Sequence, residues 1–296
     1  MLKRSHASRP SVFEVATLNE HGVQEKTSIA GEHPLTLYLD KHELVTLMTL
    51  GAEPELLSLG YLRNQRFVDS LDELDAVQVD WESESVAITS KVMASTGISL
   101  WEQSGNKIAQ KMEHRTVTTG CGQGTVFGGL MDEVDAIKLD LSWQFHQASL
   151  NALLEQMRKH ESIYKVAGAV HGCALFSIDP TRPHAPALLC FVEDVGRHNA
   201  VDAIAGWMWL NTAPLKATKD LLVFYTTGRL TSEMVIKAAQ MGIGVLVSRS
   251  GLTHMGYQLA KQLNMTLIGR CQGRHFLLFA GAERFVSDPT LAKYPG

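Results

Sequence analysis

The chain has 296 residues, of which 45% are hydrophobic and 20% charged, and its formal net charge is −4. This composition predicts a globular protein with a large core, built as two domains or one large one. The negative charge argues against broad binding to a nucleic-acid backbone, which requires a basic surface. No apolar run approaches the roughly 18 residues of a membrane-spanning helix, so we expect no membrane span.

The first half of the sequence is predicted to be rich in β-strands. Residues 1–11 are basic but lack the apolar core of a signal peptide, and we expect them to form a disordered tail. Apolar and polar residues alternate over 35–39 and again over 44–50, which predicts a β-hairpin. A short helix is expected at 54–65, and 91–115 show no clear period. Further strands are expected at 77–81, 85–89 and 134–141.

From about residue 143 the pattern changes, because continuous apolar runs alternate with segments of helical period. This alternation predicts a mostly parallel sheet with helices on its faces. The expected strands are 187–192, 221–225, 245–247 and 266–268. The expected helices are 147–160, 199–210, 231–241 and 253–263. Residues 166–177 fit either a helix or a buried strand. We therefore divide the chain into a β-rich part, 1–140, and an α/β part, 141–296.

Polar segments follow three of the predicted strands directly, at 193–199, 226–233 and 248–253. Ligands of an open parallel sheet bind beyond the carboxyl ends of its strands, so these segments would face one crevice. Helix N-termini and arginines there would hold phosphate groups, which predicts a site for a phosphorylated, nucleotide-like ligand. The candidate residues are Glu193, Asp194, Arg197, His198, Arg229, Thr231, Ser232, Ser248 and Ser250.

The same residues also allow a structural interpretation. Glycine and serine after strands are the usual turn residues of any α/β protein. Glu193, Asp194, Arg197 and His198 could equally form an ion-paired network that closes the top of the sheet. Both interpretations stay open on the sequence alone.

His171 and Cys173 raise the question of a zinc site. A zinc deaminase would have a glutamate two residues after the histidine and a Cys-x-x-Cys further on. The four cysteines, at 121, 173, 190 and 271, form no such pair. We therefore expect no zinc, and we expect Cys173 and Cys190 to fill the core.

Cys121 lies in the glycine-rich run 118–129, which suits neither a helix nor a strand interior. We expect a mobile loop with an accessible thiol, either functional or simply structural. Widely spaced cysteines in a chain of this length, with no export signal, are expected to be free thiols in a reducing cytoplasm.

These segments resemble the FdhD/NarQ family, the formate dehydrogenase accessory sulfurtransferases. The resemblance covers most of the chain. It is strongest at Glu193-Asp194-Val195-Gly196-Arg197-His198-Asn199-Ala200-Val201-Asp202, at Thr227-Gly228-Arg229-Leu230-Thr231-Ser232-Glu233-Met234 with Lys237-Ala238-Ala239, and at Gly120-Cys121-Gly122. It implies an α/β fold with a cytidine-deaminase-like, three-layer α/β/α C-terminal part without zinc, beside a smaller β-rich N-terminal part. It also implies a cytoplasmic homodimer.

The resemblance further implies that Cys121 takes sulfur as a persulfide from a cysteine desulfurase. The sulfur would pass to the molybdenum cofactor, bis(molybdopterin guanine dinucleotide), destined for formate dehydrogenase. The family's cofactor-binding stretch maps onto Arg270, Cys271, Gln272, Gly273, Arg274 and His275. Many members carry Cys-x-x-Cys in the loop, whereas this chain has Gly124 at the second position. The alternatives are therefore a sulfurtransferase and a non-catalytic chaperone of the cofactor, with a zinc deaminase as a remote third.

Overall fold

The computed structural model describes residues 2–103 and 134–288, so Cys121 and its loop lie outside the described residues. The chain forms two compact units. Unit 1 comprises Met1–Asp132, Ser162–Gly172 and Val192–Asn211, and unit 2 comprises Glu133–Glu161, Cys173–Phe191 and Thr212–Gly296. Two segments from beyond residue 140 therefore belong with the N-terminal part.

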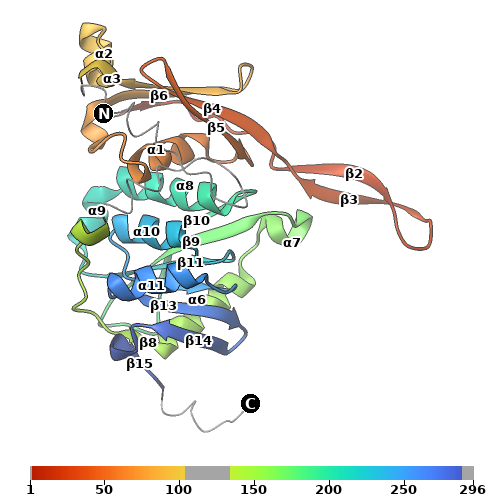
Figure 1. Ribbon diagram of the computed structural model, residues 1–296. Coiled ribbons are helices and arrows are strands. Elements are labelled where there is room, and N and C mark those ends of the chain that lie inside the picture. The colour runs from red at the N-terminus through yellow and green to blue at the C-terminus, as the bar shows by residue number, and fades with distance from the viewer. Residues whose placement is uncertain (1, 104–133, 289–296) are drawn as a thin grey trace. The chain divides into compact units, whose positions relative to one another are not determined.

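Unit 1 contains a five-stranded sheet with strand order β1-β6-β7-β4-β5 (Figure 1). The hairpin expected at 35–50 is confirmed, because β4 and β5 pair antiparallel around Asp40 and Lys41, which have positive φ angles of 48° and 73°. Part of the expected disordered tail is instead a strand, since β1 pairs parallel with β6. The strands are β1 Lys3–Arg4, β4 His33–Leu39, β5 His42–Thr49, β6 Leu74–Asp80 and β7 Ser85–Ser90.

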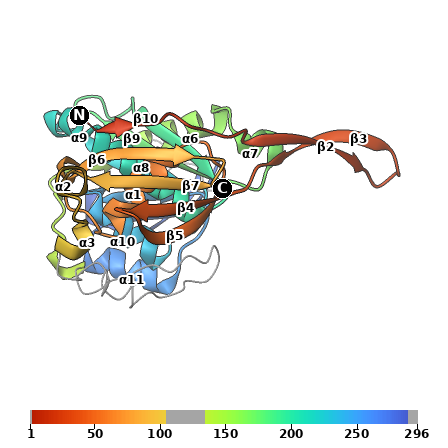
Figure 2. The same cartoon turned by 90° about the horizontal axis from the view of Figure 1, so that it is seen from above.

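Several short elements of unit 1 were not anticipated. Strands β2 (Val12–Leu18) and β3 (Gln24–Ala30) form a separate antiparallel pair, which extends away from the sheet in Figures 1 and 2. The segment 91–115, which shows no clear hydrophobic period in the sequence, contains the short helices α2 (Lys91–Thr96) and α3 (Leu100–Gln103) in its described part. The short helix α7 (Ile163–Ala167) also belongs to unit 1, although it follows residue 140 in the sequence.

Helices α1 (Pro54–Asn64) and α8 (Arg197–Leu210) pack against each other, and both were expected. Most side chains of each helix are buried, as in a helix that is covered on all sides. The two backbones touch at Gly60 and Gly206. A Cβ atom at Gly60 would overlap the carbonyl oxygen of Asp202, and one at Gly206 would overlap that of Leu56. Glycine is thus required at both positions of the contact.

Unit 2 is built on a six-stranded sheet with strand order β10-β9-β11-β12-β13-β14. Strands β11, β12 and β13 run parallel, whereas β9 and β14 lie antiparallel to their neighbours β11 and β13. The sheet is therefore mixed rather than mostly parallel. Its strands are β9 His171–Ile178, β10 Ala187–Asp194, β11 Leu221–Thr226, β12 Val245–Ser248, β13 Thr266–Gln272 and β14 His275–Ala280. The ambiguous segment 166–177 is resolved as mainly strand β9.

Helices cover both faces of this sheet, with α10 and α11 on one side and α6 on the other (Figures 1 and 2). Leu150 and Leu153 of α6 join a buried core with Phe176, Val223 and other strand residues. The helices are α6 Gln147–Lys159, α9 Thr212–Ala217, α10 Ser232–Gln240 and α11 His254–Gln262. The short strands β8 (Phe145–His146) and β15 (Phe285–Val286) pair parallel.

The prediction of a strand at 134–141 is wrong. The segment holds only a 3₁₀ turn, Val134–Ala136, because its apolar residues do not alternate over enough positions to form a ladder. The mixed α/β class is otherwise as expected. No helix within the described ranges is long and apolar enough to cross a bilayer.

We predict that Gly206→Ala destabilises the protein by about 3 kcal/mol, because the added methyl group must push α1 and α8 apart. Gly251→Ala is the matched control, since a Cβ atom there meets nothing within 4 Å. Urea denaturation followed by circular dichroism gives both values. Equal stability of the two variants would show that the helix contact tolerates a side chain.

Candidate functional site

The loops after β11 and β12 and the last part of strand β13 are joined by hydrogen bonds. The Ser248 hydroxyl donates to the carbonyl oxygen of Gly228 (2.7 Å) and accepts from the backbone N–H of Ser250 (2.9 Å). The backbone N–H of Arg270 donates to the carbonyl oxygen of Ser250 (2.7 Å). The structure thus brings three of the candidate segments together, with Ser248 fully buried between them.

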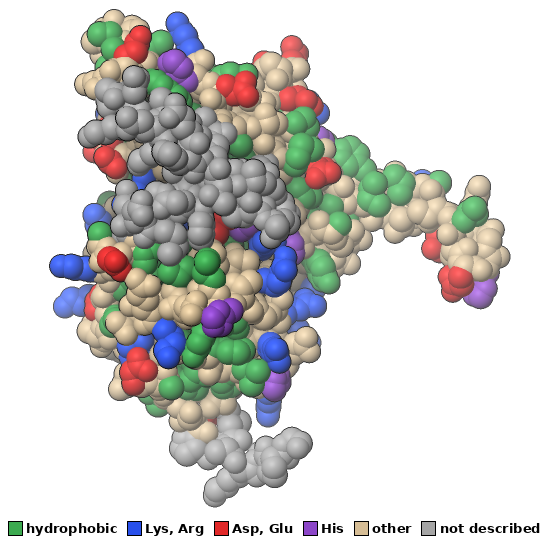
Figure 3. Space-filling view, viewed as in Figure 1, with side chains coloured by type: hydrophobic (Ala, Val, Ile, Leu, Met, Phe, Trp, Pro, Cys, Tyr) green, Lys and Arg blue, Asp and Glu red, His purple; other side chains and the backbone are tan. Residues whose placement is uncertain are grey.

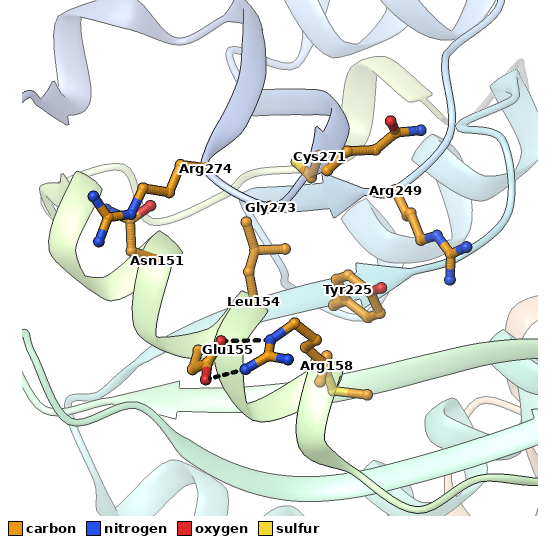
Figure 4. Close-up of a pocket in the computed structure, with 11 residues that line it drawn as sticks. Asn151, Leu154, Glu155, Arg158, Tyr225, Arg249, Cys271, Gly273 and Arg274 are labelled. Carbon is orange, nitrogen blue, oxygen red and sulfur yellow. Dashed lines mark hydrogen bonds and ion pairs between the residues drawn. The ribbon is translucent and has the colours of Figure 1, made fainter. Parts of the chain in front are cut away.

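A cavity of about 700 Å³ lies beside these loops, within unit 2. Figure 4 shows residues from the β12 and β13 ends facing helix α6 across it. Five of the lining residues come from the polar segments or the cofactor-binding stretch considered in the sequence: Arg249, Cys271, Gln272, Gly273 and Arg274. The others are Asn151, Leu154, Glu155, Met157, Arg158 and Tyr225.

The charges of the cavity are mainly cationic. Arg158 donates two hydrogen bonds to Glu155, at 2.8 and 2.7 Å, and these bonds hold the pKa of the Glu155 carboxyl at about 2. Arg249 and Arg274 are exposed side chains at the same cavity. The cavity thus carries three guanidinium groups and one carboxylate, and this net positive charge favours an anionic ligand.

The inner wall of the cavity is neutral. Burial raises the pKa of the Tyr225 hydroxyl to about 12. Burial also raises the pKa of the Cys271 thiol to about 12, although a backbone hydrogen bond from Ser248 offsets part of this effect. Both groups carry their protons at neutral pH, so they can form hydrogen bonds but contribute no charge.

The acidic residues of the 193–199 segment serve the structure of unit 1. Glu193 accepts hydrogen bonds from the backbone N–H groups of Ile163 (2.6 Å) and Tyr164 (3.1 Å) and so caps α7. Asp194 is buried and accepts from the Thr49 hydroxyl (2.5 Å) and from the backbone N–H of Leu50 (3.1 Å).

Asp194 accepts two more hydrogen bonds, from the backbone N–H of Gly196 (2.9 Å) and the side-chain amide of Asn199 (2.8 Å). Burial raises the pKa of its carboxyl, and the four hydrogen bonds offset part of this rise. Arg197 is buried and His198 half-buried in the same unit. These contacts support the structural interpretation of Glu193 and Asp194, although their partners are mostly neutral groups rather than ion pairs.

The remaining candidates lie around the start of α10. Thr231 is the N-cap residue, but its hydroxyl makes no capping hydrogen bond in the structure, whereas Thr253 of α11 accepts from the backbone N–H of Gly256 (3.2 Å). Arg229 is exposed and Ser232 half-buried. Arg270, Gln272, Arg274 and His275 are exposed at the β13–β14 turn.

The zinc question concerns His171 and Cys173. The Cys173 thiol is buried and donates to the Thr226 hydroxyl (3.3 Å). Among the residues that the structure describes, no three His, Cys, Asp or Glu side chains are grouped so that they could hold a metal ion. Cys190 is half-buried rather than a full member of the core.

Sequence reasoning missed the contribution of α6 to the cavity. Asn151, Leu154 and Arg158 line it, whereas the sequence pattern indicates only a helix at 147–160. A signal was present, because Arg158 lies one turn from Leu154 and continues the apolar stripe with a cation.

We predict that Cys271 reacts with iodoacetamide at pH 8 roughly 1,000-fold more slowly than an ordinary thiol, because thiolate is the reactive form and its pKa is about 12 rather than 9. The urea-unfolded protein is the matched control, and peptide mass spectrometry measures the modified fraction. Since the folded-state pKa is raised, the thiol stabilises the fold below pH 9, and this contribution is lost between pH 9 and about 12. Rapid labelling of the folded protein would contradict a buried neutral thiol.

The chain is similar to known proteins over most of its length. The model of the FdhD/NarQ family matches residues 30–286. A protein of Bacillus licheniformis named sulfur carrier protein FdhD is 28% identical over 263 residues, covering 88% of this chain and 91% of the relative. A protein of the same name from Listeria monocytogenes is 27% identical over 275 residues, covering 92% and 95%.

The fold is also shared with a solved structure. A crystal structure from Desulfotalea psychrophila, described as a formate dehydrogenase accessory protein, superposes with a TM-score of 0.67 at 22% identity. The match covers 93% of this chain and 98% of that one. At this identity the likeness establishes the fold alone.

Proposed function

Because the chain belongs to the FdhD/NarQ family, we propose that it is a sulfur carrier that serves the activation of formate dehydrogenase. The finer proposal is that Cys121 takes sulfur from a cysteine desulfurase and passes it to the molybdenum cofactor, which is bound as a substrate. The observation that supports this most directly is the cationic cavity formed by the β12 and β13 ends and α6.

The cavity suits one guanine nucleotide arm of bis(molybdopterin guanine dinucleotide). Its volume of about 700 Å³ is in the range of small-molecule sites. Arg249 and Arg274 are exposed donors for phosphate oxygens, and Leu154, Met157 and Tyr225 offer apolar and aromatic surface for a planar base. The side chains present thus supply donors for an anionic group and apolar surface for a planar group, which supports this proposal.

The sulfur transfer takes two displacement steps. The Cys121 thiolate attacks the outer sulfur of the donor's persulfide, forming a new S–S bond while the donor cysteine leaves as a thiolate. An electron pair of the acceptor then attacks the outer sulfur on Cys121, and Cys121 leaves as a thiolate in turn. Neither step requires a second thiol, so Gly124 is compatible with the mechanism.

A non-catalytic chaperone that binds the cofactor without moving sulfur is the second candidate. Two observations favour it: Gly124 replaces the second loop cysteine, and Cys271, the thiol that lines the cavity, is held protonated. The chaperone would use the same cavity, so ligand binding does not separate the two candidates, whereas sulfur loading does.

We predict that incubation with a cysteine desulfurase and cysteine adds about 32 Da, one sulfur atom, to Cys121. In a host that lacks its own copy, Cys121→Ser then yields inactive formate dehydrogenase, and Cys190→Ser serves as the matched cysteine control. The measurements are intact-protein mass spectrometry and formate oxidation in extracts. Full activity with Cys121→Ser would leave the chaperone as the function.

We predict that Arg249→Ala weakens the binding of GDP, a surrogate for one arm of the cofactor, by about 1.5–3 kcal/mol through the loss of a charged hydrogen bond. Arg182→Ala is the control, because Arg182 is an exposed arginine paired with Asp179 and is not part of the cavity wall. Isothermal titration calorimetry measures both affinities. An unchanged affinity in Arg249→Ala would place the nucleotide elsewhere.

A further inference from the structure

Unit 1 has a cavity of its own, with a volume of about 630 Å³, and it shares no lining residue with the cavity of unit 2. It lies where the first residues of the chain meet the start of α1, the turn before β6, the start of α2 and the end of α8. Small-molecule sites typically have volumes of about 300–1,000 Å³. The sulfur transfer proposed above gives this cavity no role.

Part of the wall is apolar. Leu56, Leu71, Leu210 and Trp207 are half-buried, so each presents hydrocarbon to the cavity, and the buried Leu74 also lines it. Water that contacts such surface is released when an apolar group covers it, which favours binding. This part of the wall therefore suits the hydrocarbon body of a ligand.

Glu55 brings a buried charge to the cavity, since only 7% of this residue is exposed. Its Oε1 atom accepts hydrogen bonds from the Ser5 hydroxyl (2.6 Å) and the backbone N–H of Ala7 (3.0 Å). The Ser5 hydroxyl in turn accepts from the backbone N–H of Val79 (2.9 Å), which fixes its orientation. Within the described ranges, no hydrogen bond or ion pair reaches the second oxygen, Oε2. Buried carboxylates usually have a cationic partner, and this one lacks it.

A second carboxylate lies close to Glu55. Glu53 is the N-cap residue of α1 and lines the same cavity. Burial raises the pKa of its carboxyl, the charge of Glu55 raises it further, and Arg4 opposes the rise. The two carboxylates therefore repel each other, and a cation placed between them relieves this repulsion.

The remaining charges leave the cavity negative. Asp72 and Lys91 are exposed and balance each other in number, and His6 completes the titratable side chains of the described wall. Helix α8 ends beside the cavity at Leu210, and the C-terminal end of a helix carries a partial negative charge. On the face drawn in Figure 3, Asp and Glu side chains lie over unit 1, whereas Lys and Arg side chains gather over unit 2. This distribution attracts a cation to unit 1.

We propose that the cavity of unit 1 binds an organic ammonium ion, that is, a primary amine carried by an apolar body. The ammonium group donates hydrogen bonds to Oε2 of Glu55 and to the carboxylate of Glu53, which neutralises the buried charge. The apolar body covers Trp207 and the half-buried leucines.

Other classes of ligand satisfy only part of the wall. Among the residues that the structure describes, no three His, Cys, Asp or Glu side chains are grouped so that they could hold a metal ion. A hydrated ion also leaves the leucines and Trp207 uncovered. An organic anion covers them but is repelled by Glu55 and Glu53. An ammonium group on a hydrocarbon body matches both parts.

Isothermal titration calorimetry on the full chain tests the proposal with phenethylamine. The matched ligand control is 3-phenylpropionate, which has a similar body but carries a carboxylate. We expect phenethylamine to bind with a dissociation constant on the order of 1 mM or lower, and 3-phenylpropionate to bind at least about 10-fold more weakly. L-Phenylalanine distinguishes two sources of the amine, and both support the proposal. Tighter binding than phenethylamine identifies an amino acid, held also by Arg4 or Lys91, and weaker binding identifies a simple amine.

Glu55→Gln is the informative variant, because the amide oxygen still accepts from Ser5 and Ala7 while the charge is removed. It is expected to weaken phenethylamine binding on the order of 10- to 100-fold. Glu43→Gln is the matched control, since Glu43 is an exposed carboxylate of unit 1 outside the cavity wall. Glu53→Gln changes an exposed position and is expected to weaken binding on the order of 10-fold, which gives a second measure if Glu55→Gln does not fold.

Circular dichroism establishes that each variant is folded before its affinity is compared. Three results would each overturn the proposal. They are no binding of phenethylamine to the unmodified chain at about 10 mM, equal affinity for the amine and for 3-phenylpropionate, and an affinity in folded Glu55→Gln and Glu53→Gln that equals that of Glu43→Gln.

Discussion

The candidate site depends on the two hydrogen bonds of the Ser248 hydroxyl. It lies fully buried at the carboxyl end of β12, where it bonds to the loop after β11 and to its own loop. The loop after β12 in turn accepts the backbone N–H of Arg270 through the Ser250 carbonyl. Buried backbone groups need such partners, so one small side chain links two loops, and a backbone hydrogen bond adds the third segment.

The cavity beside these loops separates charge from apolar surface. Tyr225 and Cys271 stay protonated inside, while the guanidinium groups are accessible from solvent. Hydrogen bonds to arginine are strong and directional, whereas the apolar wall of α6 accepts many flat groups. This division suits a ligand with a planar end and an anionic end.

The sequence was sufficient where a local pattern decides the structure. Alternation predicted the 35–50 hairpin, Pro54 near a first turn indicated α1, and segments of helical period predicted α6, α8, α10 and α11. The sequence was insufficient where a strand pairs with a partner that lies far away along the chain. Strand β14 and the antiparallel placement of β9 depend on distant partners, and β1 is held by two residues of β6.

The candidate site shows the same division. Polar residues after parallel strands identified the loop at 248–250, because chain direction alone brings such ends to one edge, whereas the stretch 270–274 was indicated by the family resemblance. Glu193 and Asp194 could not be assigned in this way. Most of their partners are backbone N–H groups far away in the sequence, at Ile163, Tyr164 and Leu50, and no local side-chain pattern encodes such distant contacts. The α6 wall was missed because its polar residues also suit a solvent-facing helix surface.

The glycine contact between α1 and α8 has a consequence for synthesis of the chain. Helix α1 ends at Asn64, but the helix that covers it begins only at Arg197. At about 5–20 residues per second, translation leaves the buried side of α1 without its cover for several seconds. The N-terminal sheet thus emerges from the ribosome as an incomplete body. Its maturation must await more than a hundred later residues, a period in which chaperones have an exposed apolar helix to bind.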